Sequence, residues 1–361
     1  PIIDRYFDRL ESRLRDRGVT APLQAMQSNG GTTSFASART HPLTLVESGP
    51  AAGVNGAVVV GRAAGLPDVI AFDVGGTTAK CSLIRGGMAT VNTDYWIEKT
   101  RHHPGYPVKA PVVDIVEVGA GGGSIARIAA DGRLRVGPQS AGAEPGPACY
   151  GRGGTQPTVT DAKLLTGVLD TNRFSGGRLS LSTEKAAKAM QPVADALRVS
   201  IVEAAAAVIR LAEANMINAL KLVSVQRGHD PRDFAMLAYG GGGAMHAAQL
   251  SRELGTKELV IPLYPQYSGS TTASVFDAVT RTLQSWRWIP ELRFVNAYHD
   301  HPAYIAALAD SLRDASVQAQ DKPPHLVMSF HGVPERYIEQ GDPYFCHAHK
   351  TARLLAESLE L

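Results

Sequence analysis

The hydrophobic positions of this chain alternate between the spacing of helices and that of strands over the first 260 residues. Residues 1–18 place apolar side chains on one helical face and charges on the other, and a glycine ends the segment. Apolar runs at 69–74, 234–240 and 257–263 are typical of buried strands. A Ser–x–x–Glu capping pattern opens a long helix expected over 201–226. Strands alternating with glycine turns and helices predict an α/β fold with phosphate-binding loops.

Composition excludes several classes of protein. The 361 residues are enough for two or three domains, and 44% hydrophobic content with 19% charge excludes a disordered chain. A net charge of +2 gives no reason to expect nucleic acid or an anionic membrane as a partner. No apolar run approaches the roughly 20 residues of a membrane span. Three scattered cysteines indicate no disulfide framework, so a cytoplasmic location is expected.

The sequence FDVGGTTAK, at residues 72–80, is the sharpest local motif. Asp73 closes an apolar strand, Gly75 and Gly76 form a tight turn, and the hydroxyl groups of Thr77 and Thr78 follow. Backbone N–H groups converging at such a turn suit a nucleotide phosphate. We expect Asp73 to hold the Mg²⁺ that accompanies the phosphates, directly or through water. The alternative is an ordinary β-hairpin with a Gly-Gly turn.

A second glycine cluster, AYGGGGAMHA, follows the strand at 234–240 and opens a helix. Four consecutive glycines cost backbone entropy and are hard to justify by packing alone. They would let a base or a ribose lie directly on the backbone, and they are Gly240, Gly241, Gly242 and Gly243. His246 lies one turn into the helix, where we expect it to cap or pack rather than to catalyse.

Two carboxylates precede a third glycine-rich segment, GAGGGS, at residues 119–124. Asp114 and Glu117 are candidates for a metal ligand or a general base. A solvated pair on the surface is the simpler explanation of two acidic residues at this spacing.

Together these segments resemble the hydantoinase A / 5-oxoprolinase family, which includes subunits of acetone and acetophenone carboxylases. The resemblance covers about residues 1–260. It depends on MQSNGG (26–31), SGPAAG (48–53), FDVGGTTAK (72–80), VGAGGGSIA (118–126), VGPQSAGAEPGPACYGRGG (136–154), PTVTDA (157–162) and RGHDPRDFAMLAYGGGGAMHA (227–247).

The family resemblance implies an actin-like/sugar-kinase/Hsp70-type ATPase fold, in which two ribonuclease-H-like halves close over ATP. It implies ATP-dependent activation of a cyclic amide (a hydantoin or 5-oxoproline) or a ketone by phosphoryl transfer, with Mg²⁺ and often a hydantoinase B-like partner subunit. Residues 73–78 match the family's second phosphate loop, and residues 240–243 match its adenosine-contacting turn.

This sequence departs from the family pattern in two ways. Lys80 stands where the family usually carries an acidic residue, which changes the charge expected around the metal. The family's first half and its first phosphate loop would precede Pro1, and the chain opens inside a charged helix as if cut from a longer protein. We therefore expect weak ATP binding that depends on Asp73 and Thr77.

After Tyr264 the sequence changes, since glycine becomes rarer and Tyr, Trp, His and Pro more frequent. The pattern predicts a helix near 303–318 and a buried strand at 325–330. This part resembles ferrochelatase, which inserts Fe²⁺ into protoporphyrin IX on a doubly wound α/β fold. The resemblance depends on LVIPLYPQYSGSTTASVFDAV (259–279), WIPELRFVNAYHDHPAYIAAL (288–308) and LVMSFHGVPERYIEQGDPYFCHAHKTARLLAESL (326–359).

The ferrochelatase resemblance implies that His331 is the active-site histidine, which ligates iron transiently or accepts a pyrrole proton. Tyr264 and Tyr267 are candidates for the aromatic wall of a porphyrin site. The C-H-x-H segment is too compact for a tetrahedral metal site, so we expect the start of a solvated helix there. That segment contains Cys346, His347 and His349.

The sequence thus predicts a hydantoinase-like nucleotide-binding domain over residues 1–258 and an incomplete ferrochelatase-like segment over 259–361. Three classes of function remain open: an ATP-dependent hydrolase or carboxylase subunit, a metal chelatase, and a chimeric or truncated chain without turnover. Since ferrochelatase continues beyond Leu361 with an acidic partner for the histidine, we expect residues 264–361 to bind porphyrin poorly and to insert no iron.

Overall fold

The computed structural model describes residues 2–97, 103–171, 174, 180–260, 266–284, 287, 295–318, 328, 330 and 333–360. The chain forms two compact units. The first contains residues 1–65, 88–114 and 297–361, and the second contains residues 66–87 and 115–296. The domain boundary expected between residues 258 and 259 stays a prediction from the sequence.

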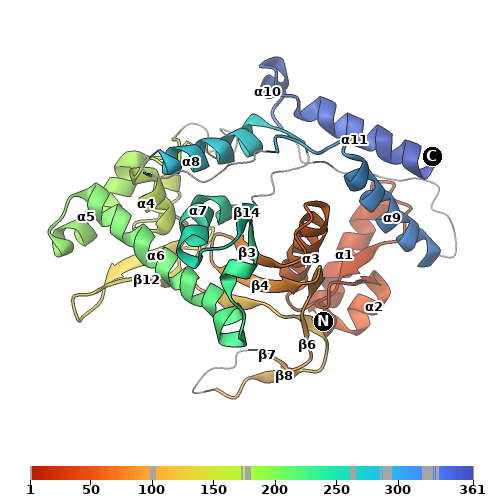
Figure 1. Cartoon of the computed structure of the whole chain (residues 1–361), viewed down its shortest axis with the longest axis horizontal. Helices are drawn as coiled ribbons and strands as arrows, with labels where there is room; N and C mark the ends of the chain where they lie inside the picture. Colours follow the sequence, from red (N-terminus) through yellow and green to blue (C-terminus); the bar gives the residue numbers. More distant parts are fainter. Residues whose placement is uncertain are drawn as a thin grey trace. The chain divides into compact units, whose positions relative to one another are not determined.

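The second unit is built on a mixed β-sheet with the strand order β10–β4–β3–β13–β14, of which Figure 1 labels β3, β4 and β14. β3 is parallel to β13 and antiparallel to β4, which a short turn joins to it. The strands are β3 (Val69–Val74), β4 (Ala79–Arg85), β10 (Val116–Val118), β13 (Ala235–Tyr239) and β14 (Glu258–Val260). The strands expected at 69–74 and 234–240 are confirmed. Of the strand expected at 257–263, residues 261–263 lie outside the described residues.

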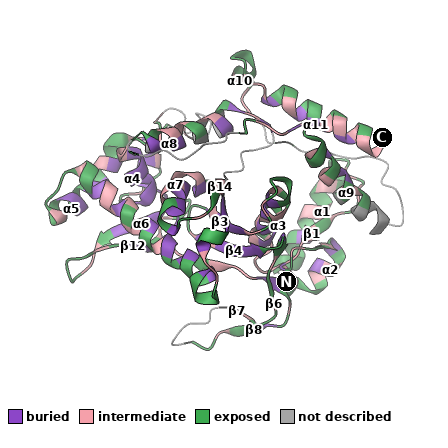
Figure 2. Ribbon diagram, viewed as in Figure 1, coloured by how far each residue is buried: buried purple, intermediate pink, exposed green. Residues whose placement is uncertain are grey.

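Two helices, α6 (Ile201–Val223) and α7 (Gly243–Leu254), pack on this sheet. Their apolar side chains form one cluster with β3, β4 and β13, and Figure 2 shows the buried residues concentrated there. The capping box expected at Ser200 opens α6, since Ser200 and Glu203 each accept a hydrogen bond from the other's backbone N–H. α6 ends at Val223, three residues earlier than expected, and a 3-10 turn continues to Arg227.

A second hydrophobic cluster lies against another side of α6. It joins the hairpin of β11 (Ser124–Ile128) and β12 (Leu134–Ser140) to α4 (Val159–Leu165) and α5 (Thr183–Leu197). A buried carboxylate fixes the start of α4. Asp161 accepts hydrogen bonds from the Thr158 hydroxyl at 2.8 Å and the Cys149 N–H at 2.7 Å, as well as from two further backbone N–H groups. The unit also contains α8 (Ser274–Leu283).

The first unit combines short hairpins with helices. Phe7 of α1 and Phe35 of α2 stack edge-to-face at 4.6 Å between ring centroids and form the centre of one small core. The helix expected over residues 1–18 is confirmed, although only Phe7 of its apolar face is fully buried. The helices here are α1 (Ile2–Asp16), α2 (Phe35–Thr40) and α3 (Ser48–Ala63), with strands β1 (Gln24–Met26), β2 (Thr32–Ser34), β5 (Met88–Ala89), β6 (Val91–Asn92), β7 (Tyr95–Ile97), β8 (Tyr106–Val108) and β9 (Val112–Val113).

The ferrochelatase-like part contributes helices to the first unit. α9 (Pro302–Gln318) confirms the helix expected near 303–318 and packs against α11 (Tyr344–Leu359), and α10 (Glu335–Glu339) lies between them in sequence. Most of the strand expected at 325–330 lies outside the described residues. Within the described ranges, no helix is both long and apolar enough to cross a membrane.

Candidate functional site

Two of the predicted glycine turns meet at one edge of the sheet. The turn at Gly75 leaves the carboxyl end of β3, and the turn at Gly240 leaves the carboxyl end of its parallel neighbour β13. The N–H of Gly242 donates a 2.8 Å hydrogen bond to the carbonyl of Val74. The structure therefore brings together the two segments that the sequence assigned to phosphate and to adenosine, as the parallel pairing of their strands requires.

Gly240 illustrates why this edge needs glycine. Its φ of +78° lies in the left-handed region, and a Cβ there would collide with Asp73 Oδ1 and lie 2.7 Å from the carbonyl oxygen of Val74. At Gly241, by contrast, a Cβ would meet nothing within 4 Å. Gly76 in the first turn is equally open. Gly240 is thus required by packing, whereas Gly241 and Gly76 leave open space at the strand ends.

A third glycine turn, Gly119–Gly123, packs on the first one. The N–H of Gly122 donates to the carbonyl of Gly75 at 3.1 Å, and a Cβ on Gly121 would lie 2.6 Å from the carbonyl carbon of Thr77. From the sequence, GAGGGS was one of the family motifs and the segment that follows two carboxylates, and no contact with the first turn was expected. The signal for its role was the run of glycines itself, which permits two backbones to approach closely.

The turn from Gly75 to Thr78 is also a true hairpin turn, because the N–H of Gly75 donates to the carbonyl of Thr78 at 3.0 Å. The two interpretations of this motif from the sequence, a phosphate-binding turn and an ordinary β-hairpin, therefore describe the same backbone. The third glycine turn and the turn at Gly240 surround this hairpin, which an ordinary β-turn would not require.

A row of polar side chains crosses the sheet at the same edge. Tyr239, Asp73, Lys80 and Glu117 are register partners in successive strands, so they share one face. The Lys80 ammonium lies 3.1 Å from Glu117 Oε2. Burial raises the pKa of the Asp73 carboxyl, and the nearby charge of Lys80 opposes that rise. Burial, followed by the charge of Asp73, raises the pKa of the Tyr239 hydroxyl.

The two carboxylates that precede the third turn have different surroundings. Glu117 is half exposed and forms the ion pair with Lys80. Asp114 is partly buried, and its backbone N–H donates to the carbonyl of Thr90 at 2.8 Å. Neither belongs to a group of three or more potential metal ligands among the described residues, where no such group is found.

The residues at the strand ends fit Mg²⁺ only as part of a nucleotide complex. Mg²⁺ in phosphoryl-transfer sites uses one or two carboxylates and takes its other ligands from phosphates and water. Asp73 supplies one half-buried carboxylate beside two turns with open backbone. The neighbouring ammonium of Lys80 adds positive charge that suits phosphate rather than a bare cation.

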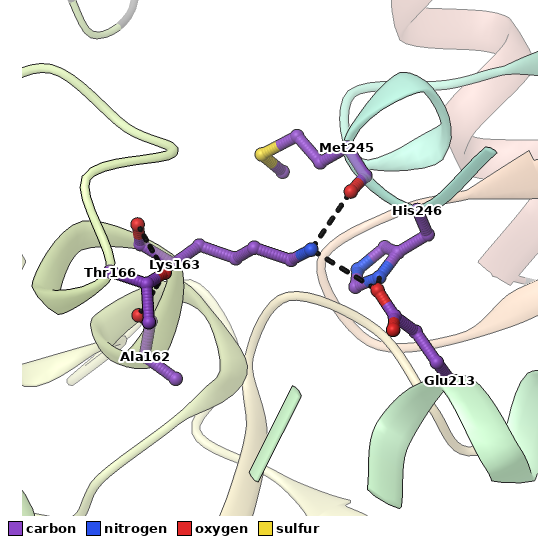
Figure 3. A network of polar contacts seen from close by, with 6 residues as sticks. All are labelled: Ala162, Lys163, Thr166, Glu213, Met245 and His246. Carbon is purple, nitrogen blue, oxygen red and sulfur yellow. Dashed lines mark hydrogen bonds and ion pairs between the residues drawn. The ribbon is translucent and has the colours of Figure 1, made fainter. Parts of the chain in front are cut away.

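A buried polar cluster lies at the first turn of α7, which begins at Gly243 (Figure 3). The ammonium of Lys163 on α4 contacts Glu213 Oε1 on α6 at 3.3 Å and donates to the carbonyl of Met245 at 2.8 Å. The Nδ1 of His246 on α7 lies 3.0 Å from the same Glu213 oxygen. All three side chains are at least nine-tenths buried. The expectation that His246 caps or packs rather than catalyses agrees with its burial.

Burial and the charge of Lys163 lower the pKa of His246 to about 4, so the imidazole is neutral near pH 7. Burial alone would raise the pKa of the Glu213 carboxyl, but the hydrogen bond of His246 and the charge of Lys163 bring it below its ordinary value. The cluster is therefore a lysine–glutamate ion pair in which Nδ1–H of a neutral histidine donates to the carboxylate.

His331 and Tyr264 lie outside the described residues. Tyr267 is partly buried. The C-H-x-H segment forms the first turn of α11, as expected, with Cys346 and His349 exposed. His347 differs from the expectation of a solvated residue, because its ring stacks on that of His299 at 3.6 Å between centroids.

Comparison with known proteins identifies relatives of both parts of the chain. The family model described as hydantoinase/oxoprolinase matches residues 1–281, and the ferrochelatase model matches residues 221–361. The caprolactamase subunit alpha of Pseudomonas jessenii is 37% identical over 263 residues, which are 73% of this chain and 37% of that protein. The ferrochelatase of Hydrogenovibrio crunogenus is 52% identical over 131 residues, which are 36% of this chain and 34% of that enzyme.

Two solved structures are similar over most of the chain. A nucleotide-free acetone carboxylase, studied for ATP-dependent acetone carboxylation, has a TM-score of 0.65 at 25% identity and covers 86% of this chain. The ATP-dependent caprolactamase of Pseudomonas jessenii has a TM-score of 0.62 at 28% identity and covers 98%. The expected ATPase-like α/β fold and both family resemblances are confirmed.

The chain spans less than two fifths of the length of the curated hydantoinase-type relatives, and 43% and 53% of the two solved chains. The two family matches overlap at residues 221–281, which contain the second glycine turn. The overlap also contains the position near Leu259 where the sequence pattern changes. The hydantoinase/oxoprolinase model matches more than three quarters of this chain. The chain therefore belongs to the hydantoinase/oxoprolinase family, and its C-terminal part is similar to ferrochelatase.

Proposed function

We propose that the chain is the nucleotide-binding part of an ATP-dependent enzyme that acts on a cyclic amide, or of a ketone carboxylase subunit. The observation that carries the proposal is the meeting of the Gly75 and Gly240 turns around the carboxylate of Asp73. Glycine turns at the carboxyl ends of neighbouring parallel strands are a common location for phosphate groups.

Each part of the strand-end edge has a role in this proposal. The backbone of Gly75 and Gly76 and the hydroxyl groups of Thr77 and Thr78 bind phosphate oxygens. Asp73 orients the Mg²⁺ bound to them, and Lys80 adds positive charge beside it. The Gly240–Gly243 turn receives the adenosine, with Gly241 offering open backbone to a flat ring.

The chemistry that follows is transfer of the γ-phosphoryl group of ATP to the carbonyl oxygen of the substrate, with ADP as the leaving group. Water then attacks the phosphorylated amide carbon and the ring C–N bond breaks, which leaves an acyl phosphate that a second water hydrolyses to the acid and inorganic phosphate. A ketone instead loses an α proton to a base as it is phosphorylated, and the α carbon of the enol phosphate bonds to the carbon of bicarbonate as inorganic phosphate is released. The names of the similar proteins, an ATP-dependent caprolactamase and an acetone carboxylase, support this pair of reactions. The word subunit in the name of the caprolactamase relative supports a hydantoinase B-like partner.

The test is release of ADP from Mg-ATP by the full chain with a panel of hydantoin, 5-oxoproline, caprolactam and acetophenone with bicarbonate. The proposal expects at least one compound to accelerate ADP release over the rate with ATP alone. Asp73→Asn should abolish the acceleration. ADP release that no compound changes, with and without a B-like subunit, would count against the proposed reactions.

Ferrochelatase activity is the second candidate, favoured by 52% identity over 131 residues. The residue that would ligate iron or accept a pyrrole proton is His331. We keep the expectation that the segment inserts no iron on its own. Haem formation from Fe²⁺ and protoporphyrin under anaerobic, reducing conditions tests it, because turnover that disappears in His331→Ala would establish a chelatase instead.

A further inference from the structure

The Lys163–Glu213–His246 cluster joins α4, α6 and α7 at the first turn of α7, which begins at Gly243 (Figure 3). Lys163 donates to the main-chain carbonyl of Met245, so one of its bonds holds the backbone of the first turn of α7. Glu213 holds the next residue, His246, through its ring. The cluster therefore bonds to two consecutive residues, Met245 and His246, in the first turn of α7.

The same short helix, α4, also holds the other glycine turns. The N–H and the hydroxyl of Thr160, three residues before Lys163, both donate to the carbonyl of Gly122 at 2.8 Å. The N–H of Gly122 in turn donates to the carbonyl of Gly75. Because positions three apart lie on neighbouring parts of a helix surface, α4 connects the phosphate turn to the adenosine turn through Thr160 and Lys163.

A third contact connects the second glycine turn directly to the end of β3. The N–H of Gly242 donates to the carbonyl of Val74 at the end of β3, one residue before Gly75. The start of α7 is thus held from the sheet on one side and from α4 and α6 on the other. The relative position of the two turns is determined by hydrogen bonds from both directions, not by the sheet alone.

An apolar cluster could fill the same space without the cost of burying charges. Two charges removed from water stabilise a fold only when their geometry and their remaining hydrogen bonds are good, and hydrophobic replacements are often as stable. Lys163 and Glu213, however, form directed bonds to particular atoms of α7, the Met245 carbonyl and the His246 ring, which side chains without polar atoms cannot form. This direction indicates a positioning role.

The geometry points to Lys163, Glu213 and His246 as positioning residues that hold the Gly240–Gly243 turn at the distance from the Gly75 turn that a nucleotide requires. The inference rests on the proposed nucleotide site. It makes no claim that any of the three touches the ligand. It implies that their loss weakens adenosine binding as much as ATP binding, because the phosphate turn itself is left unchanged.

The first experiment measures amide hydrogen exchange of residues 240–246 in the full chain without nucleotide. Lys163→Met with Glu213→Gln removes both charges together and so leaves no unpaired buried ion. The inference expects exchange in this segment at least tenfold faster than in the wild type, while β3 and β4 exchange as before. The control is Val208→Ala, a fully buried position of α6 in the separate cluster with α4 and α5.

The second experiment measures the dissociation constants of Mg-ATP and adenosine by calorimetry. Both should rise about tenfold in the double variant and stay at the wild-type values in Val208→Ala. His246→Asn keeps a short N–H donor and should retain most of the affinity, whereas His246→Ala should lose it. Such rescue by the conservative variant separates positioning from mere filling of space.

The two experiments fail in different ways. A wild-type chain that binds no nucleotide would refute the proposed function, and the exchange of residues 240–246 would still decide whether the cluster holds the turn. Unchanged exchange of this segment in the double variant would overturn the positioning role. A rise in the dissociation constant for ATP but not for adenosine would overturn it as well.

Discussion

Two polar groups of the second unit, both near the Gly240 turn, are built in opposite ways. In the Lys163–Glu213–His246 cluster every side chain is at least nine-tenths buried, and the ammonium of Lys163 pairs with the carboxylate of Glu213. In the row of Asp73, Lys80 and Glu117 the Glu117 side chain is 42% exposed, and the Asp73 carboxyl is half-buried beside Lys80.

The difference shows which group is available to a ligand. A buried ion pair that is bonded to the start of α7 is shielded from a substrate, so its contribution is to hold the backbone. A half-exposed carboxylate beside an ammonium and open glycine turns still has lone pairs and space for an incoming group. We therefore propose that the row binds the ligand and that the cluster positions the turn.

Breaking one side of the buried ion pair should have the largest effect. Lys163→Met leaves the Glu213 carboxylate buried with only the His246 hydrogen bond, and we expect the free energy of unfolding to fall by about 3–5 kcal/mol. Adding Glu213→Gln should restore much of it, because no unpaired charge then remains. Chemical denaturation of the single and double variants measures this, and additive losses would contradict the pairing.

The second-largest effect should be a decrease in the free energy of unfolding as the pH falls, because the cluster contains His246 and Glu213. The pKa of His246 is about 4 in the folded chain against 6.5 ordinarily, so the unfolded chain takes up the proton first as the pH falls. Stability present above pH 6.5 should therefore decrease by about 3 kcal/mol between pH 6.5 and 4. Glu213 acts in the same direction, since its lowered pKa gives stability that is lost as the pH falls through that folded-state value.

Denaturation curves at pH 7.0, 5.5 and 4.5 measure this loss. His246→Asn, which cannot titrate, should have a flatter dependence than the wild type over the same range. Parallel curves for the two proteins would show that other groups dominate the acid sensitivity.

Two neighbouring glycines distinguish a position that packing requires to be glycine, Gly240, from one that leaves space for a ligand, Gly241. Gly240→Ala meets both a positive φ and Asp73, so we expect a loss of about 2 kcal/mol in unfolding free energy. Gly241→Ala meets nothing and should change stability by less than about 0.5 kcal/mol. The same Gly241→Ala should nevertheless weaken Mg-ATP binding about tenfold, because its methyl group occupies the space of the adenosine. Equal effects of the two variants on stability would contradict the assignment.

The half-exposed pair should matter least to the fold. Glu117→Gln removes the partner of Lys80 at the surface end of the row, and exposed ion pairs contribute about 1 kcal/mol or less. Thermal melting should barely change. A loss comparable to that of Lys163→Met would mean that the row is a structural element and not a ligand site.

The sequence predicted the glycine turns because glycine reports directly on backbone geometry. Each turn follows a strand predicted from the sequence, but the parallel pairing of β3 and β13 that places both turns at one edge is known only from the structure. The buried cluster could not be predicted, because Lys163, Glu213 and His246 are separated by 50 and 33 positions and only the packing of three helices joins them. Of the three, the sequence singled out only His246, as a residue expected to cap or pack rather than to catalyse.

The third glycine turn shows a different limit. A run of glycines permits either a ligand or another backbone to approach, and the residues themselves do not distinguish the two. At Gly121 the group that approaches is the backbone of Thr77, whereas Gly241 faces open space. Only the tertiary structure separates these two uses of the same residue type.

The central claim is that Asp73, between the two turns, belongs to a Mg-ATP site. Calorimetric titration of Mg-ATP into the full chain and into Asp73→Asn tests it most directly. The account predicts that the variant folds and that its dissociation constant rises about 10- to 100-fold, as the loss of one or two charge-assisted contacts requires. Binding of Mg-ATP with the same dissociation constant in both proteins would contradict it.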